Sequence, residues 1–544
     1  QRGADPLGAF AAHFRGRAAR AAEPPALGLD ERLARYIVEG SRDGLIEDLD
    51  RKLAEGATPL EIINGPLMRG MDEVGRLFND NQLIVAEVLQ SAEAMKAAVA
   101  HLERFMAKAE TATRGTFLLA TVKGDVHDIG KNLVEIILTN NGYRVIDLGI
   151  KVPPETLIAA CREHKPDAIG LSGLLVKSAQ QMVVTAQDFR AAGIDVPLFV
   201  GGAALTKKFT ATRIAPEHAG PTLYARDAME GLDLANQLFA APTREALLAR
   251  LRREYAALAE PAPAAAPAPA EPLPPARVYL PRVEPPRPPD FEPHVLRDVP
   301  LAHIYPYLNL QMLYGKHLGL RGLVGRLLEQ GDPKAREVHE TVEALKERAV
   351  RERLLVAHGI YQWFRARAEG DAVVVLDAGG GEAARFTFPR QAAGERLCLA
   401  DYLRDDTEDY LAAFAVTCGL GVRERAETWK ERGEYLASHA LQALAIECAE
   451  AFAEWLHARL RTLWGFPDPA DVPIAEKLKG RYRGIRVSFG YPACPSLADQ
   501  ATLWRLLHPE RVGITLTEGF MMDPEASVSA LVFHHPAARY FKAE

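Results

Sequence analysis

The spacing of apolar residues divides the chain into regions of different expected structure. Between residues 30 and 108, apolar positions recur at helical spacing and predict four helices with short breaks, an arrangement typical of a small bundle. From Thr113 onward, short continuous apolar runs such as GTFLLATV alternate with helical patterns. This alternation predicts a parallel sheet with helices on both faces, in which ligands bind at the carboxyl ends of the strands.

A stretch rich in alanine and proline separates these regions from the rest of the chain. It spans residues 260–293, cannot form a core and predicts an extended linker. Beyond it, helical patterns fill residues 331–366 and 434–463, and strand-like segments occur in IRVSFGYPACPS, GITLTEGF and SVSALVFHH. The mixture predicts an α+β domain. The expected fold class is therefore multidomain, α + α/β + α+β, with a helical bundle and a doubly wound, Rossmann-like middle domain.

Three consecutive glycines, Gly379, Gly380 and Gly381, could be taken for a dinucleotide-binding loop after the apolar run VVVLDA. They lack the G-x-G-x-x-G spacing, and the strand-like FTF follows them instead of a helix. DAVVVLD and ARFTFPR are therefore expected to pair as a hairpin.

Composition excludes several classes of protein. The 544 residues are 48% hydrophobic and 25% charged, with a net charge of −7, so no excess of basic residues points to nucleic acid. No apolar run is long enough to span a membrane, and no signal segment is evident. The five cysteines are scattered and form no CxxC pair, which argues against a disulfide scaffold or a thiolate zinc site. A cytoplasmic location is expected. The missing initiator methionine suggests a fragment of a longer protein.

The motif with the clearest chemistry is GDVHDIGKN, residues 124–132, between a predicted strand and a predicted helix. His127 would stand at the carboxyl end of the strand, and Asp125 could accept the proton of one ring nitrogen. Such a carboxylate fixes the tautomer and makes the other nitrogen a better metal ligand. The alternative is a loop histidine beside glycines that only turn the chain.

The wider context of this motif resembles the cobalamin-binding fingerprint of B12-dependent methyltransferases and mutases. SGLL follows the third predicted strand and GGA follows the fourth. The resemblance implies that His127 binds cobalt in place of the cofactor's own base. It also implies that the nucleotide tail enters a slot kept open by Gly201 and Gly202, although small residues there could serve packing alone. Ser178 would complete a relay with Asp125 and His127, or act as a helix N-cap.

The implied cobalamin contacts in this domain are Gly124, Asp125, Val126, His127, Asp128, Gly130, Ser172, Leu174, Val176, Gly201, Gly202 and Ala228. Residues 61–103 resemble the helical cap of cobalamin-dependent methionine synthases. That resemblance implies that Phe78, Val85 and Val88 cover the upper corrin face and that Asn64 faces the cofactor. An apolar cover would exclude water from the reactive cobalt. These apolar residues could instead belong to the core of the bundle.

The segment RGIRVSFGYPACP, residues 483–495, looks like the signature of the methionine synthase activation domain, which binds S-adenosylmethionine. Arg486 would hold the ligand's carboxylate. The other implied contacts are Glu450, Ser488, Gly490, Tyr491, Tyr540 and Phe541. The chain has His303 where that family usually has an aspartate, and Gly480 replaces a frequent glutamate, so altered S-adenosylmethionine binding is expected.

Together, these resemblances imply the C-terminal half of a cobalamin-dependent methionine synthase. The expected boundaries are an N-terminal linker (1–27), helical cap (28–111), cobalamin domain (112–250), linker (251–293) and activation domain (294–544). The family uses methylcobalamin to move a methyl group from 5-methyltetrahydrofolate to homocysteine, and S-adenosylmethionine as methyl donor for reductive reactivation of Co(II). A zinc ion would belong only to an absent homocysteine module.

The implied partners are the homocysteine and methyltetrahydrofolate modules of the full-length enzyme and a flavodoxin-like or other reductase. No nucleic acid or membrane partner is expected. Two alternatives remain at this point. A corrinoid carrier or B12 sensor would share the cap and cobalamin domain but would not need the GYPACP module. A mutase subunit would share D-x-H-x-x-G but not the cap.

Overall fold

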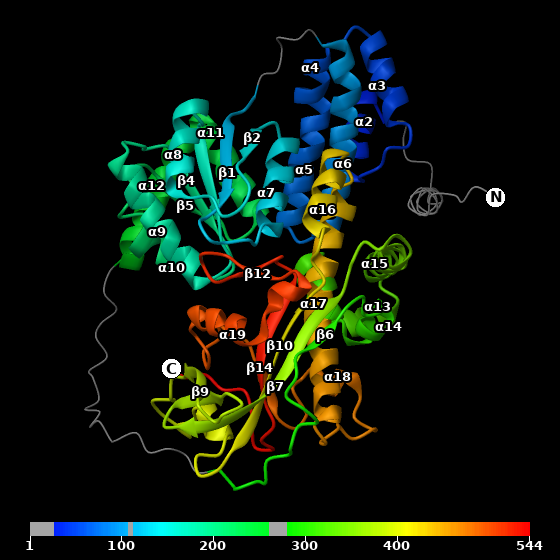
Figure 1. Ribbon diagram of the computed structural model, residues 1–544. Helices are drawn as coiled ribbons and strands as arrows, with labels where there is room; N and C mark the ends of the chain where they lie inside the picture. Colours follow the sequence, from blue (N-terminus) through cyan, green and yellow to red (C-terminus); the bar gives the residue numbers. More distant parts are fainter. Residues whose placement is uncertain (1–26, 107–112, 260–279, 544) are drawn as a thin grey trace, which may run out of the picture. The chain divides into compact units, whose positions relative to one another are not determined.

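The computed structural model describes residues 27–106, 113–259 and 280–543 (Figure 1). The predicted N-terminal linker lies almost wholly outside the described residues, as does most of the alanine- and proline-rich stretch. The chain divides into two compact units. The first, here the N-terminal unit, contains residues 1–262, 310–351 and 424–443; the remaining residues form the C-terminal unit.

The N-terminal unit begins with the predicted helical bundle. Its elements are α2 (Leu29–Val38), α3 (Leu45–Ala54), α4 (Pro59–Ile62), a π-helical turn (Ile63–Leu67), α5 (Met68–Asn79) and α6 (Val85–Leu102). Thr58 caps α4: its hydroxyl accepts from the backbone N–H of Glu61, whose carboxylate accepts from the backbone N–H of Thr58. A side chain at Gly70 would lie 2.7 Å from the carbonyl oxygen of Ala34, so this glycine lets α5 approach α2 closely.

A five-stranded parallel sheet follows, in the order β2-β1-β3-β4-β5. The strands are β1 (Thr116–Thr121), β2 (Arg144–Asp147), β3 (Ala168–Ser172), β4 (Leu198–Gly201) and β5 (Thr222–Tyr224). The helices between and after them are α7 (Ile129–Asn140), α8 (Pro154–His164), α9 (Val176–Ala191), α10 (Lys207–Phe209), a π-helical turn (Thr210–Ile214), α11 (Ala228–Phe239) and α12 (Ala241–Ala259). The predicted doubly wound domain is confirmed.

The strand order indicates at which strands of this sheet a ligand is expected to bind. β1 pairs with β2 on one side and β3 on the other, so the connections diverge between β1 and β3. In doubly wound sheets, ligands bind at the carboxyl ends of the strands beside such a point of divergence. Phe117 and Leu119 pack in one hydrophobic cluster and Leu118 and Ala120 in another, because successive side chains of a strand point to opposite faces.

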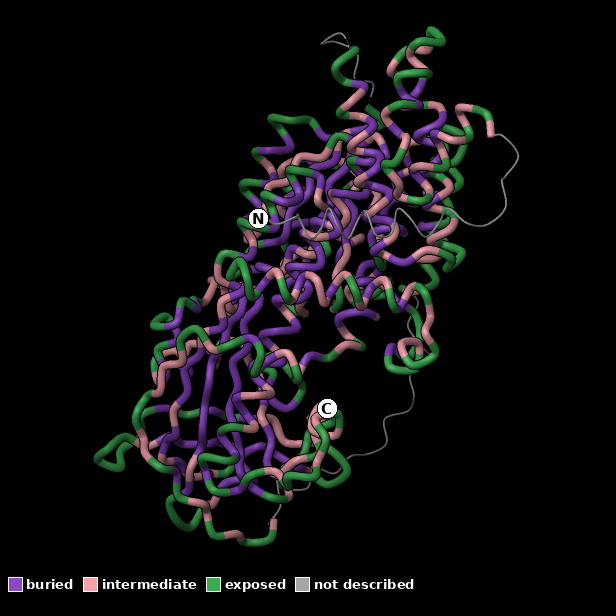
Figure 2. Tube along the Cα trace, turned by 90° about the vertical axis from the view of Figure 1, so that its right-hand side faces the viewer, coloured by how far each residue is buried: buried purple, intermediate pink, exposed green. Residues whose placement is uncertain are grey.

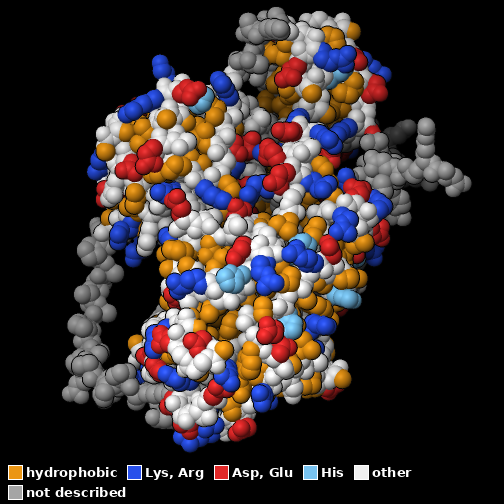
Figure 3. All heavy atoms as spheres, in the orientation of Figure 1, with side chains coloured by type: hydrophobic (Ala, Val, Ile, Leu, Met, Phe, Trp, Pro, Cys, Tyr) orange, Lys and Arg blue, Asp and Glu red, His pale blue; other side chains and the backbone are white. Residues whose placement is uncertain are grey.

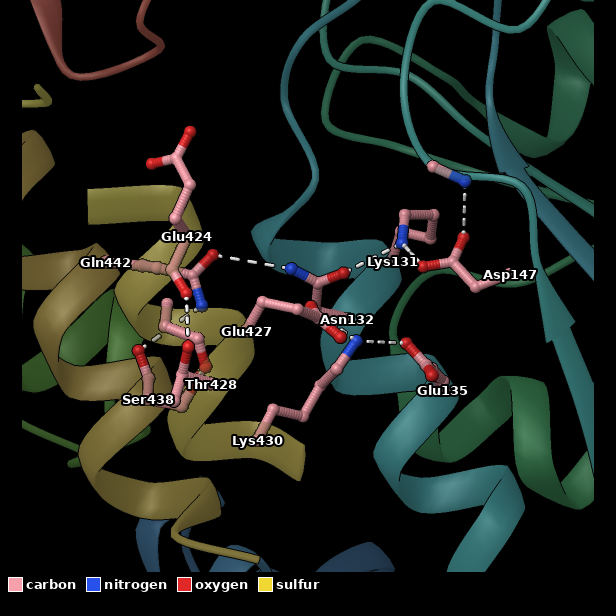
Figure 4. A network of polar contacts seen from close by, with 12 residues as sticks. Lys131, Asn132, Glu135, Asp147, Glu424, Glu427, Thr428, Lys430, Ser438 and Gln442 are labelled. Atoms are coloured by element: carbon pink, nitrogen blue, oxygen red, sulfur yellow. Dashed lines mark hydrogen bonds and ion pairs between the residues drawn. The ribbon is translucent and has the colours of Figure 1, made fainter. Parts of the chain in front are cut away.

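Two segments from beyond the linker also belong to the N-terminal unit. The first holds a π-helical turn (Gln311–His317), α14 (Val324–Gln330) and most of α15 (Pro333–Glu352); the second holds most of α16 (Val422–Glu431) and the beginning of α17 (Tyr435–Leu463). Lys430 of α16 forms an ion pair of 2.7 Å with Glu135 of α7 (Figure 4). The amide of Asn132 donates to Gln442 of α17 at 3.4 Å. Compact packing therefore does not follow the expected domain boundary at residue 294.

The C-terminal unit is built on a mixed helix and sheet framework, as predicted. Its main sheet runs β11-β14-β10-β7-β8-β9, with β6 also paired to β7. The strands are β6 (His294–Leu296), β7 (His358–Glu369), β8 (Ala372–Leu376), β9 (Glu382–Thr387), β10 (Asp409–Thr417), β11 (Ile485–Val487) and β14 (Ser527–Phe533), with a separate pair β12 (Thr515–Leu516) and β13 (Met522–Asp523). The helices are α13 (Leu301–Ile304), the rest of α17, α18 (Ile474–Lys477) and α19 (Gln500–Leu507). The strands β10 and β14 are buried almost throughout (Figure 2).

One helical prediction is wrong over part of its length. The pattern over residues 331–366 is a helix only as far as Glu352, and His358 begins the long strand β7. In that strand Arg365 and Arg367 alternate with the buried Ala366, which is the period of a strand. Pairing with β10, about 50 residues later, and with β6 and β8 supplies its backbone hydrogen bonds.

The expected hairpin is confirmed by the antiparallel pairing of β8 with β9. The carboxylate of Asp377 accepts hydrogen bonds from the backbone N–H groups of Gly379 and Gly381. In a dinucleotide-binding loop, such N–H groups would bind a phosphate instead.

In the described ranges, no helix is long and apolar enough to cross a bilayer. On the face drawn in Figure 3, basic and acidic side chains are interspersed.

Candidate functional site

The loop between β1 and α7 holds the histidine and aspartate predicted to act together. Gly124 has a φ of 78°, a conformation that favours glycine, and turns the chain before Asp125. Asp125 Oδ1 lies 2.6 Å from Nδ1 of His127 and accepts from the His127 backbone N–H at 3.0 Å. The Asp125 side chain is fully buried, whereas that of His127 is 19% exposed. The imidazole is therefore partly exposed, whereas the carboxylate that holds it is buried.

The second carboxylate oxygen of Asp125 is held by α9 and the loop before it. Ser178 donates its hydroxyl to Asp125 Oδ2 at 2.5 Å, and the backbone N–H of Leu174 donates to the same oxygen at 2.8 Å. Ser178 is the third residue of α9, and Leu175 occupies the N-cap position, so the N-cap interpretation of Ser178 is wrong. The structure brings His127, Asp125 and Ser178 together in the order of the expected relay.

These bonds determine the charge of Asp125. Burial by itself would raise the pKa of its carboxyl, but hydrogen bonds from His127 and Ser178 and the charge of His127 lower it. An ionised Asp125 keeps the proton of His127 on Nδ1, which leaves the lone pair on Nε2. That is the arrangement of a histidine prepared to bind a metal.

Glycines around this loop bring backbone segments close together. Gly202 has a φ of 146°, and a Cβ there would lie 1.7 Å from the carbonyl oxygen of Gly173. A Cβ at Gly201 would lie 3.0 Å from the carbonyl oxygen of Ala225. Tight packing of the loops after β3, β4 and β5 is therefore sufficient to explain both glycines, whether or not a ligand lies beside them.

Other features of this edge fit a large ligand with a metal centre. A Cβ added at Gly130, in the first turn of α7, would meet no atom within 4 Å, so the space beside it is open. Val176, at the start of α9, is 65% exposed, an unusual fraction for a valine. A histidine anchored by a buried carboxylate supplies one nitrogen ligand. Together these residues could hold a ligand that has both an apolar part and a metal atom.

The remaining predicted cobalamin residues are distributed over several elements. Val126, Asp128 and Ala228 are buried, whereas Ser172 and Leu174 are partly exposed. Ala228 begins α11 and packs in the cluster between α7 and α11. Asn64 is exposed in the π-helical turn of the bundle.

Three cap residues were expected to cover the corrin. In this structure, all three contact other residues of the protein. Val88 is 2% exposed and belongs to a cluster with residues of β1 and α7. Phe78 packs against the same cluster, with the guanidinium of Arg321 5.9 Å from its ring centre. A Cβ at Gly319 would lie 2.7 Å from the backbone nitrogen of Val85. In the arrangement observed, all three serve packing within the N-terminal unit.

A second candidate site surrounds Arg486 in the C-terminal unit. Arg486 is the central residue of β11, whose neighbours Ile485 and Val487 face the core. Its side chain points the other way, toward α17, where Nη2 donates to Glu450 at 3.1 Å and to Glu454 at 3.0 Å. Its Nε is buried without a hydrogen-bond partner. Burial would lower the pKa of this guanidinium, but the charges of the two glutamates outweigh it and raise the pKa.

Aromatic residues flank Arg486. The hydroxyl groups of Tyr482 and Tyr540 lie 2.9 Å apart, and a Cβ at Gly480 would touch the Tyr540 ring at 3.3 Å. Tyr491 and Tyr540 are 61% and 54% exposed, which is consistent with a surface open to a ligand. His303 stacks on Trp455, the neighbour of Glu454, with ring centres 6.1 Å apart.

The other predicted contacts of this site are less exposed. Ser488 is partly exposed in the loop after β11, and Gly490 is exposed with a φ of 92°. Phe541 packs against the hydrophobic core of this unit. Glu454 was not predicted from the sequence. Its spacing of four residues from Glu450 could have indicated it, because residues i and i+4 share one face of a helix.

The domains that hold these two candidate sites match known families. Residues 29–103 and 115–232 each match a family described as a B12 binding domain, and residues 300–544 match the activation domain of vitamin B12-dependent methionine synthase. The methionine synthase of Mycobacterium tuberculosis is 37% identical over 561 aligned residues, which cover 96% of this chain and 47% of that protein. The chain thus combines two B12-binding domains with the activation domain of a vitamin B12-dependent methionine synthase. The methionine synthase of Mycobacterium leprae is 36% identical and is aligned over 99% of this chain and 49% of its own length.

The chain therefore spans about half the length of these methionine synthases. Among solved structures, it is similar to the reactivation domain of MetH bound to AdoHcy, with 29% identity, a TM-score of 0.46, and coverage of 48% of this chain and 84% of that one. It is also similar to the methanol:cobalamin methyltransferase complex MtaBC of Methanosarcina barkeri, with 28% identity, a TM-score of 0.37, and coverage of 44% and 93%.

Proposed function

We propose that this chain carries cobalamin for the methyl transfer of a methionine synthase and supports its reductive reactivation with S-adenosylmethionine. In the complete enzyme, the methyl group would pass from 5-methyltetrahydrofolate to homocysteine and give methionine. The observation that carries the proposal is the hydrogen-bonded set of His127, Asp125 and Ser178 at the ligand-binding edge of a B12-binding domain. The partners would be the homocysteine and folate modules and a flavodoxin-like or other reductase.

Cobalamin, when bound, would supply a cobalt centre that accepts a methyl group from one substrate and gives it to the next. In this chain, Nε2 of His127 would bind the cobalt. Asp125 would keep the proton on Nδ1, and Ser178 would stabilise the Asp125 charge. Because all three groups are linked by hydrogen bonds, a proton gained or lost at His127 would be shared with Asp125.

The cofactor's ring and tail would lie along the loops that follow β1, β3 and β4. The apolar Val176 and the open space beside Gly130 would accept parts of the ring system. The proposed contacts from the sheet domain and the cap are Gly124, Val126, Asp128, Ser172, Leu174, Gly201, Gly202, Ala228, Asn64, Phe78, Val85 and Val88. The cap residues would take this role only after they leave their present packing.

S-adenosylmethionine would bind around Arg486. The guanidinium would hold the ligand's carboxylate, because its unpartnered Nε and its Nη2 form one edge that matches a carboxylate. Glu450, Ser488, Gly490, Tyr491, Tyr540 and Phe541 would line the remainder. A corrinoid carrier or B12 sensor would need the B12-binding domain but not an activation domain, so the match over residues 300–544 favours the methionine synthase role.

The axial role of His127 can be tested by electron paramagnetic resonance of the Co(II) cofactor bound to this chain. We expect the nitrogen hyperfine pattern to change when histidine is labelled with ¹⁵N. The His127→Gly variant should lose this label-dependent pattern, whereas replacement of His164, at the end of α8, should leave it intact. A pattern in wild type that ignores the label would refute cobalt ligation by His127.

A further inference from the structure

The Arg486 guanidinium is shared by two carboxylates one helical turn apart on α17. Glu450 and Glu454 both accept from the same atom, Nη2, at 3.1 and 3.0 Å. The neighbouring Nε is buried and has no partner. This arrangement leaves one bonded and one unbonded N–H on the edge of the guanidinium that normally binds a carboxylate in bidentate fashion.

A ligand carboxylate would change these contacts. To bind the Nε and Nη2 edge with two parallel hydrogen bonds, it must take the position that the glutamates occupy at Nη2. Binding of the amino-acid end of S-adenosylmethionine, as in the function proposed above, would therefore release at least one glutamate from Arg486. The fate of the released carboxylate depends on its burial.

The two glutamates differ in exposure. The side chain of Glu450 is 47% exposed, so water can solvate its charge once it leaves Arg486. The side chain of Glu454 is only 16% exposed, and a buried carboxylate without a cation is strongly unfavourable. The α-ammonium group of the ligand is one carbon away from the carboxylate that displaced it and can supply the missing charge.

We propose that Glu454 accepts the α-ammonium group of the ligand when the ligand's carboxylate takes its place on Arg486. Arg486 and Glu454 then form the two halves of a recognition site for a zwitterionic amino acid. A ligand that lacks the amino group leaves the largely buried Glu454 carboxylate unpaired. The inference rests on the proposed S-adenosylmethionine site and adds a residue that determines its specificity.

The test compares two stable ligands by isothermal titration: S-adenosylhomocysteine and its desamino analogue, 4-(5′-adenosylthio)butanoate. The wild-type chain should prefer the amino ligand by about tenfold or more, the usual size of a charge-assisted hydrogen bond. Glu454→Gln should reduce this preference to about twofold or less. The matched variant Glu450→Gln, on the same helix face, should keep the wild-type preference even if both ligands bind more weakly.

Two results would overturn the inference while the proposed binding site stands: an unchanged preference in Glu454→Gln, or loss of preference in Glu450→Gln instead. If the wild-type chain binds neither ligand, the proposed site itself is wrong, and the inference falls with it. Circular dichroism checks the fold of each variant. If Glu454→Gln does not fold, Glu454→Asp replaces it in the test. This variant withdraws the carboxylate by one methylene and should still lower the preference for the amino ligand. An unchanged preference in Glu454→Asp would also count against Glu454.

Discussion

Gly202 shows how strongly a single residue can be constrained next to the candidate cobalamin site. A methyl group there would overlap the Gly173 carbonyl oxygen at 1.7 Å, and the φ of 146° is one that other residues avoid. We expect Gly202→Ala to lower the free energy of unfolding by about 3 kcal/mol, because backbone rather than a flexible side chain must move. Urea unfolding followed by circular dichroism would measure the change.

Gly149 is the matched control for this prediction. It also has a positive φ, 82°, but a Cβ there would meet no atom within 4 Å. Gly149→Ala should therefore cost only the backbone strain, about 1 kcal/mol. Equal losses in the two variants would mean that the contact with Gly173 relaxes and that the glycine is not required for packing.

At the scale of elements, α7 connects the His127 loop to the segment that holds α16. It begins two residues after His127 and carries Lys131, whose ammonium contacts Asp147 and Asn132 (Figure 4). One turn later, Glu135 pairs with Lys430. Burial raises the pKa of the Glu135 carboxyl even though Lys430 opposes this change. Whether the Glu135 carboxyl is charged therefore depends on the presence of Lys430.

We expect Lys430→Met to destabilise the N-terminal unit by about 2 kcal/mol, because it leaves the Glu135 carboxylate without its cation in a largely buried position. Adding Glu135→Gln should recover part of the loss, which a double-mutant cycle by urea unfolding would measure. Arg76→Met, which breaks an exposed pair with Glu73, should have a much smaller effect. Additive losses in the cycle would show that Lys430 and Glu135 do not interact.

At the scale of the whole molecule, buried neutral histidines make stability depend on pH. Burial lowers the pKa of His218, His457 and His535, and lowers that of His439 to about 4. His439 Nε2 bonds the carbonyl oxygen of His317 at 2.9 Å, which joins the two separate segments that complete the N-terminal unit. In the unfolded chain these histidines take up protons near pH 6.5, whereas in the folded chain they do not.

His439 should therefore contribute stability that is fully present above about pH 6.5 and is lost progressively as the pH falls toward about 4, by up to about 3 kcal/mol. We expect His439→Gln to flatten the dependence of unfolding free energy on pH over this range. The exposed His508 is the control, and His508→Gln should leave the dependence unchanged. Parallel curves for wild type and His439→Gln would contradict the prediction.

The local sequence pattern alone determined many of the helices and strands of this protein. Apolar spacing predicted the helical bundle, the alternation of strands and helices, and the hairpin around Gly380, because these depend on neighbours a few residues apart. The pairing of Asp125 with His127 could be expected for the same reason, since only one residue separates them. The long strand β7 was missed: only its end around Arg365 and Arg367 alternates as a strand does, and the rest is defined by pairing with β10, which is far away in the chain.

Only the tertiary structure decided how distant residues meet. Ser178 reaches Asp125 across 53 residues, Glu454 reaches Arg486 across 32, and Lys430 reaches Glu135 across 295. The sequence indicated Ser178 as either a relay partner or a cap, and it did not indicate Glu454. The reason is physical: long-range contacts depend on how whole elements pack, and the periodicity of one segment carries no information about the segment that will cover it.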